Sequence, residues 1–328
     1  MTIKTDMYLG LTRVMTAQNP ERVSTIIYRE GSYWGPNDEQ DAFHQRVAHH
    51  LFTLVLQDRL YLAPIPQPHH VLDIGTGIGL WASRRLLLKL DLSHEGRELF
   101  DLIHIRCLYG SVKDWRKLYQ QAFEHLVPGK GFIEQIEVSL VPRFWYTAGD
   151  TREVGNDFSQ LWDMGWDCDS TAADFARDNS SDSIFVMWYR FWQECSRRTG
   201  KTWFVADQMA SLIYEVGFDN VCQTRYMLPL FDVEGTSSPI FTTTATTGIC
   251  EKLLGGYTDY PVSRVAEIAR WFRQFWETGM EGWVLAWTAD EAKEFVVQTK
   301  EAIAEQNSKV YYELVVVYGQ RPLSEGEK

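Results

Sequence analysis

The chain has 328 residues, 45% of them hydrophobic, which is long enough to bury a large core as one α/β domain with insertions or as two domains. Acidic residues outnumber basic ones by 44 to 32, and a net charge of −12 opposes binding to nucleic acid or to an anionic membrane. The five cysteines are scattered and include no C-x-x-C pair, so neither a disulfide framework nor a zinc site is indicated. No apolar run approaches the roughly 20 residues that span a bilayer. We therefore expect an intracellular protein of the cytoplasm or nucleus, with no nucleic-acid or membrane partner.

The segment before residue 69 is predicted to contain a long helix. Apolar residues recur at steps of three and four positions from Ala42 to Leu60, and the run Pro36–Glu39 offers capping residues just before them. Three prolines between residues 61 and 70 then keep the chain out of a helix. We expect this helix to pack on the part of the chain that follows.

The run Val71–Trp81 is typical of a buried strand that enters a glycine turn and opens a helix. Gly75 permits a sharp turn, Gly77 lets the backbone approach a ligand, and Gly79 allows the helix to pack closely on the strand. Leu80 stands where a dinucleotide fingerprint has its third glycine, which favours S-adenosylmethionine (SAM) over NAD as the ligand. Tight turns with no ligand also use glycine, so the turn alone is a weak signal.

The elements that follow alternate between strand and helix. Short apolar runs predict strands, amphipathic runs predict helices, and glycines such as Gly217 and Gly319 end them. This alternation predicts a mostly parallel sheet that is covered on both faces. The predicted strands are 100–106, 131–138, 221–228 and 310–318, and the predicted helices are 111–126 and 202–216.

Two long inserts, at residues 142–201 and 231–307, interrupt this alternation and are predicted to be mainly helical. They are rich in tryptophan and in other aromatic residues. Inserts after the carboxyl ends of strands stand over the ligand crevice of an open α/β sheet, so a lid with an aromatic substrate chamber is one interpretation. The alternative is that the rings pack helix against helix. A third possibility is a homodimer in which the apolar inserts of the two chains cover each other.

Several short motifs follow one another in a fixed order along the chain. They are Tyr28–Tyr33, Pro36–Glu39, His49–His50, Leu60–Ile65, the glycine turn, His104–Arg106, Gly110–Ser111, Asp114–Trp115 and Val317–Gly319. This set resembles the LaeA-type SAM-dependent methyltransferases of filamentous fungi. The resemblance covers the first 140 residues apart from one gap and returns near residues 205–221 and at the C-terminus.

The resemblance implies a Rossmann-like class I methyltransferase fold of the α/β class, with SAM bound over the ends of the strands. By this analogy Asp73 and the three glycines frame the methionine end of SAM, Tyr33 lies in a segment that folds over the cofactor, and Arg106 lines the site. Together with the patterns described above, the predicted organisation is a helical segment over the cofactor site (1–68), a core (69–141), an aromatic helical insert (142–201), a core helix and strand (202–230), a second helical insert (231–307) and a final strand with a tail (308–328).

Each of these residues has a structural alternative. Asp73 could only cap the turn, Arg106 could pair with a surface acid, and Asp114 with Trp115 could be a helix start with one buried ring. The paired histidines at 49–50 and 69–70 are adjacent, so they cannot readily share an ion, and no metal is expected.

The chain departs from the family between Trp81 and Phe100. Only eighteen residues lie there, whereas the helices and strands of a regular fold need more than about 35. Asp91 is the best candidate for the acid that hydrogen-bonds the ribose of the cofactor, and the segment that supplies adenine contacts has no counterpart. A shortened enzyme that still binds SAM, a fold that has abandoned methyl transfer, and a gene model that skipped coding sequence all fit this gap.

Three functions follow from these observations. The first is a SAM-dependent methyltransferase that acts on a hydrophobic small molecule of fungal secondary metabolism. The second is a related enzyme that catalyses a cyclisation, dehydration or pericyclic step without methyl transfer, and the third is a non-catalytic LaeA-like regulator. A general base would be a histidine at a strand end, and only His104 lies at such a position. A side chain there can equally point into the core, so no catalytic residue is assigned.

Overall fold

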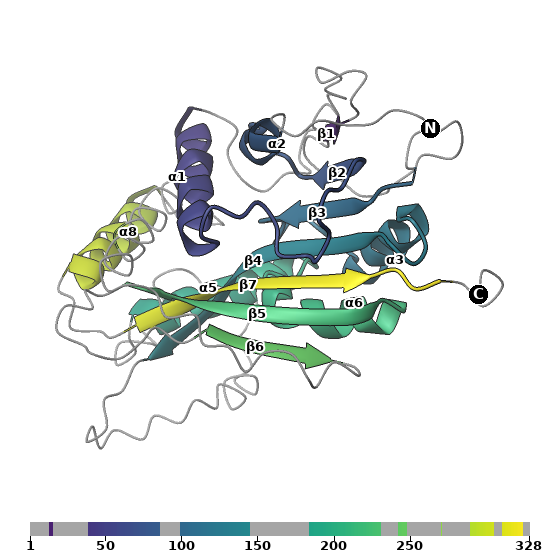
Figure 1. Cartoon of the computed structure of the whole chain (residues 1–328). Helices are drawn as coiled ribbons and strands as arrows, with labels where there is room; N and C mark the ends of the chain where they lie inside the picture. The colour runs from purple at the N-terminus through teal and green to yellow at the C-terminus, as the bar shows by residue number, and fades with distance from the viewer. Residues whose placement is uncertain are drawn as a thin grey trace.

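The structure is a computed structural model that describes residues 13–15, 39–85, 99–144, 184–230, 242–247, 270, 289–304 and 310–323. These residues contain one sheet of seven strands in the order β1-β2-β3-β4-β7-β5-β6 (Figure 1). Its strands are β1 (Arg13–Met15), β2 (Val71–Ile74), β3 (Leu102–Arg106), β4 (Phe132–Phe144), β5 (Asp219–Pro229), β6 (Thr242–Thr247) and β7 (Val310–Gln320).

The direction of the strands combines a parallel half and an antiparallel half. β2, β3 and β4 pair in parallel. β7 lies between β4 and β5 and is antiparallel to both, so β5 runs in the same direction as β4. β1 and β6 are antiparallel edge strands. The expectation of a mostly parallel sheet therefore holds only for β2 to β4. The reason is that β7, the last strand in the chain, inserts between β4 and β5 and runs antiparallel to both.

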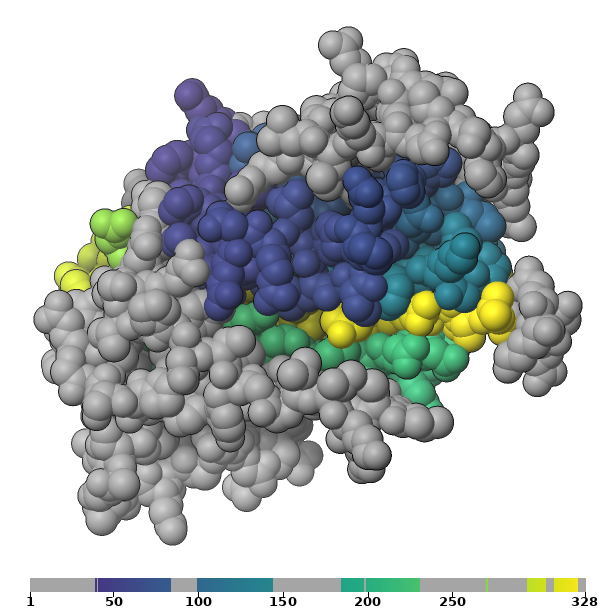
Figure 2. All heavy atoms as spheres, viewed as in Figure 1, coloured from purple at the N-terminus to yellow at the C-terminus, as the bar shows by residue number. Residues whose placement is uncertain are grey.

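Helices cover both faces of the sheet. In Figure 1, α3, α5 and α6 lie behind the sheet, α1 lies beside the carboxyl ends of β2 and β3, and the chain after α1 crosses the front. Figure 2 shows that the chain after α1, coloured dark blue, covers much of the front, and that the purple atoms of α1 lie at the upper left. The helices are α1 (Glu39–Val55), α2 (Leu80–Arg85), α3 (Trp115–His125), α5 (Ile184–Thr199), α6 (Met209–Val216) and α8 (Ala289–Ala304), with a 3-10 turn η2 (Val205–Asp207) before α6.

Several helix boundaries differ from the sequence prediction for local reasons. α1 ends at Val55 rather than near Leu60, because Gln57 and Asp58 adopt left-handed φ angles of 53° and 63°. α3 begins at Trp115, since the side chain of Asp114 caps it by accepting a hydrogen bond from the Lys117 N–H at 2.9 Å.

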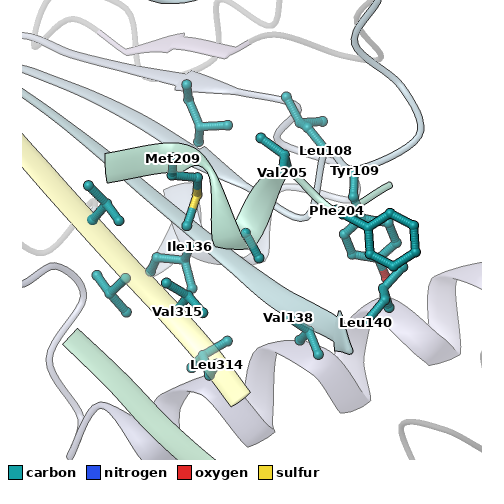
Figure 3. Close-up of a cluster of buried hydrophobic side chains, with 14 of the residues drawn as sticks. Leu108, Tyr109, Ile136, Val138, Leu140, Phe204, Val205, Met209, Leu314 and Val315 are labelled. Carbon is teal, nitrogen blue, oxygen red and sulfur yellow. The ribbon is translucent and has the colours of Figure 1, made fainter. Parts of the chain in front are cut away.

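The core is continuous from α1 to the back of the sheet. Figure 3 shows part of it, with side chains that come from β4, β7 and the segment around η2 and α6. Labelled members are Ile136, Val138 and Leu140 of β4, Leu314 and Val315 of β7, and Phe204, Val205 and Met209.

The tryptophans of the inserts that the structure describes are core residues. Trp188 and Trp192 of α5 are 2% and 1% exposed, and Trp192 stacks on Trp203 with ring centroids 4.6 Å apart. For Trp188 and Trp192 the alternative of helix packing is therefore the one observed. The remaining insert tryptophans lie outside the described residues: Trp145, Trp162, Trp166, Trp271, Trp276, Trp283 and Trp287. No described helix is both long enough and apolar enough to cross a bilayer.

Candidate functional site

The glycine turn leaves the carboxyl end of β2 in a conformation that needs glycine. Gly75, Gly77 and Gly79 have φ angles of +74°, +54° and +82°. A Cβ atom added to Gly75 would lie 2.4 Å from Cδ2 of Leu108, which belongs to the loop after β3. The turn therefore requires glycine for its backbone angles and at Gly75 also for space.

The helix α1 reaches the same turn through one side chain. Oε1 of Gln45 accepts a hydrogen bond from the N–H of Ile78 at 2.9 Å. A Cβ atom added to Gly77 would lie 2.1 Å from this oxygen. The space that glycine opens at residue 77 is thus occupied by an amide from the N-terminal helix. Sequence reasoning missed Gln45, since nothing in the helical pattern marks it.

Below the turn, Asp73 and His104 form a buried pair. Asp73 is 3% exposed, and its Oδ1 lies 3.1 Å from Nδ1 of His104, which is fully buried. The pair joins neighbouring strands, because Asp73 and His104 are register partners of β2 and β3. Trp81 stacks on His104 with ring centroids 3.9 Å apart. His104 is therefore enclosed under Trp81 and does not face a substrate.

One oxygen of Asp73 and the hydroxyl of the nearby Thr76 have no hydrogen-bond partner in the described part of the chain. They are Oδ2 of Asp73 and Oγ1 of Thr76, both buried. Asp73 thus hydrogen-bonds another strand through one carboxylate oxygen and keeps the second available for a donor, which goes beyond a simple turn cap.

Arg106 ends β3 and contacts α1. Its Nη1 lies 3.2 Å from Nδ1 of His49, and its guanidinium carbon lies 5.6 Å from the centre of the Phe52 ring. Burial lowers the pKa of Arg106, while Cys107 and Asp73 oppose this shift. The alternative of a pair with a surface acid is not what the described contacts of Arg106 show.

A second buried carboxyl group supports the loop after β3. Oε1 of Glu137 accepts hydrogen bonds from the N–H of Leu108 and from Nε2 of Gln135, both at 2.9 Å. Burial raises the pKa of Glu137 to about 7, against the opposing effect of the Leu108 N–H. Leu108 also packs against Gly75, so Glu137 helps to position the residue that supports the glycine turn.

The predicted site residues fall into two groups. Asp73, Gly75, Gly77, Gly79 and Arg106 lie together at the carboxyl ends of β2 and β3. Tyr33 and Asp91 lie outside the described residues. Asp114 and Trp115 follow their structural alternative, a helix cap and a buried ring. In the described ranges, no group of three or more His, Cys, Asp or Glu side chains is arranged to hold a metal ion.

A family model described as a methyltransferase domain matches residues 47–223, more than half of the chain. The chain belongs to this family. The methyltransferase is 26% identical to methyltransferase pytC of Aspergillus terreus, over 90% of its own length and 85% of the relative's. It is 32% identical to a secondary metabolism regulator of Cochliobolus heterostrophus, over 44% of its own length and 56% of the relative's.

One solved structure that aligns with the methyltransferase is a phosphoethanolamine N-methyltransferase of Haemonchus contortus in complex with SAM. The alignment covers 89% of this chain and 54% of that one, at 12% identity and a TM-score of 0.36. The family match and the fungal relatives confirm the predicted LaeA-like resemblance, the class I methyltransferase fold and SAM as the cofactor. The relative from Cochliobolus heterostrophus is the one whose name, LAE1, carries the resemblance.

Proposed function

We propose that this methyltransferase binds SAM at the glycine turn after β2 and transfers its methyl group to a hydrophobic small molecule. The observation that carries the proposal is the turn itself, in which three glycines with left-handed φ angles open the backbone at the carboxyl end of a parallel strand. Ligands of open α/β sheets bind at this edge.

The residues at the turn fit the amino-acid end of SAM. Oδ2 of Asp73 and Oγ1 of Thr76 are buried acceptors without hydrogen-bond partners in the described residues. An ammonium group is the kind of donor that such atoms need. The glycines give the turn its left-handed backbone next to these two acceptors. Asp73 and the glycines are therefore the residues that we assign to the methionine end.

SAM, when bound, supplies a methyl group that its sulfonium already makes electrophilic. The chain then has to hold a nucleophile in line with that methyl group, about 3 Å from it, and no covalent enzyme intermediate is needed. His104 is fully buried beneath Trp81, so we assign it to positioning Asp73 rather than to accepting a proton from the substrate.

Calorimetric titration of the purified protein with S-adenosylhomocysteine (SAH) tests the cofactor part of the proposal. We expect micromolar binding with one site per chain. Incubation with apolar aromatic metabolites, with and without SAM, then tests the reaction, and the expected product has gained one methyl group and forms only with SAM. Absence of SAH binding at saturating concentration would refute the proposal.

A second candidate function is supported by the short connection between α2 and β3. α2 ends at Arg85 and β3 begins at Leu102, so sixteen residues separate them, and β2 has the antiparallel β1 as its other neighbour. An enzyme that uses the fold for a step without methyl transfer fits this shortening. A product of unchanged methyl count that forms without SAM would favour this candidate over the first.

A further inference from the structure

The side chain of Gln45 is the contact by which α1 holds the glycine turn. Gln45 is half-buried on α1, and its Oε1 accepts the Ile78 N–H from a turn that lies 33 residues away in the chain. Because Gly77 has no Cβ, this oxygen approaches the turn more closely than any other residue type at 77 would permit.

The amide of Gln45 is itself oriented. Its Nε2 donates a hydrogen bond to Oδ2 of Asp41, one helical turn earlier, at 2.7 Å. This bond sets which end of the amide faces the turn, since the nitrogen is engaged by Asp41 and the oxygen is left for Ile78. The helix that carries both residues is anchored in the core by Val47, Leu51 and Phe52, which are at most 2% exposed.

The turn needs such a support. Three of its five residues from Gly75 to Gly79 are glycines with no side chains to pack, and Ile78 is 44% exposed. Leu108 supports Gly75 from one side, and Gln45 supports Gly77 and Ile78 from another. A flexible turn would lose entropy when a ligand orders it, and a supported one loses less.

We propose that Gln45 is a positioning residue for the cofactor, which holds the glycine turn in its binding conformation through the Ile78 N–H and is oriented by Asp41. The inference rests on the proposed binding of SAM at this turn. It adds that the N-terminal helix, and not only the strand and loop of the core, determines the affinity for the cofactor.

The substitution Gln45→Met tests the hydrogen bond, because methionine has a similar length but cannot accept the Ile78 N–H in the same way. We expect the Kd for SAH and the KM for SAM to rise about tenfold, with kcat changed less than twofold, which is the pattern of lost binding rather than lost chemistry. Circular dichroism and thermal melting of the variant show that it folds.

Exchanging the acid at residue 41 with the amide at residue 45 tests whether the lost SAH affinity can be restored. In Gln45→Glu alone, the new carboxylate faces Asp41 one turn away and binding should weaken, because like charges at this spacing repel. In the double variant Asp41→Asn with Gln45→Glu, the amide introduced at residue 41 can donate to the new carboxylate, which still accepts the Ile78 N–H. We expect the double variant to recover most of the SAH affinity, which a residue that only fills space would not require.

The matched control is Gln298→Met on α8. Gln298 is exposed and donates to Glu294 at 3.4 Å with the same spacing of four residues, but it lies on a helix that packs on α5 rather than on the glycine turn. SAH affinity should be unchanged in this variant.

The outcomes separate this inference from the proposed function. Wild-type protein that binds SAH, together with a Gln45→Met variant of equal affinity, overturns the inference and leaves the function intact. Tighter binding by Gln45→Met also overturns it, because Gln45 would then compete with the cofactor. Wild-type protein that does not bind SAH overturns both.

Discussion

The indole ring of Trp81 lies flat on the imidazole ring of His104, with centroids 3.9 Å apart and planes 8° apart. Trp81 lies in the first turn of the helix after the glycine turn, and His104 belongs to the neighbouring strand, so the contact ties α2 to β3. Nε1 of Trp81 also donates to the carbonyl oxygen of Leu60 at 2.8 Å, which joins the chain after α1 to the same point. One side chain thus holds three segments of the site together.

Replacement of this ring should destabilise the fold. Trp81 is 2% exposed, and Trp81→Phe loses the hydrogen bond to Leu60 and part of the stacked area. We expect the free energy of unfolding in urea to fall by about 1 to 3 kcal/mol. Tyr214→Phe is the control, because this ring is 54% exposed, and it should change stability by less than about 0.5 kcal/mol.

Alanine at residue 75 should disturb the glycine turn in two ways. The left-handed φ angle costs about 1 kcal/mol for any L-residue, and the new Cβ would also meet Leu108 at 2.4 Å. We expect Gly75→Ala to lower the stability by about 2 to 4 kcal/mol and the SAH affinity more than tenfold.

Gly200→Ala isolates the first effect. Gly200 has a φ angle of +63°, but no atom lies within 4 Å of its added Cβ, so only the strain of about 1 kcal/mol applies. Equal losses of stability in Gly75→Ala and Gly200→Ala, measured by urea unfolding, would contradict the contact with Leu108.

The stability should depend on pH through Glu137. Burial raises the pKa of Glu137 in the fold to about 7, above its usual 4.5, so the folded state holds this proton more tightly than the unfolded state. The resulting stabilisation is fully present below about pH 4.5 and is lost as the pH rises to about 7. Glu137→Gln should remove this contribution, on the order of 2 to 3 kcal/mol, from the pH profile.

The measurement is urea unfolding of both proteins between pH 4.5 and 8. The difference between their slopes is the informative quantity, because an amide at 137 adds a cost that does not depend on pH. Glu134, whose pKa burial also raises to about 7, keeps its own pH dependence in the variant. Glu215→Gln at the surface is the control and should follow the wild-type profile; identical slopes for Glu137→Gln and wild type would refute the prediction.

The packing of α5 on α8 should depend on a buried hydrogen bond. Nε1 of Trp188 donates to Oγ1 of Thr299 at 2.9 Å, and Thr299 is fully buried. Thr299→Val keeps the shape but removes this acceptor, so we expect a loss of about 1 to 3 kcal/mol in thermal or urea unfolding. Val297→Thr, at a position of the same helix that is 52% exposed, should stay within about 0.5 kcal/mol of wild type.

Much of the fold could be read from local patterns. The apolar runs around Leu102, Phe132, Val221 and Val310 became strands, and Gly217 ends α6 with a left-handed φ angle of 109°, as its position predicted. The place of β7 between β4 and β5 could not be read, because strand order depends on pairing between segments more than 80 residues apart.

The sequence by itself determined where the glycine turn lies, because the glycine spacing after β2 and the apolar run before it are properties of eleven adjacent residues. Only the tertiary structure decided what surrounds that turn. Asp73 meets His104 across 31 residues, and Gln45 meets Ile78 across 33. Such contacts are set by how the sheet brings β2 beside β3 and α1 against the turn, and no periodicity along the chain records that geometry.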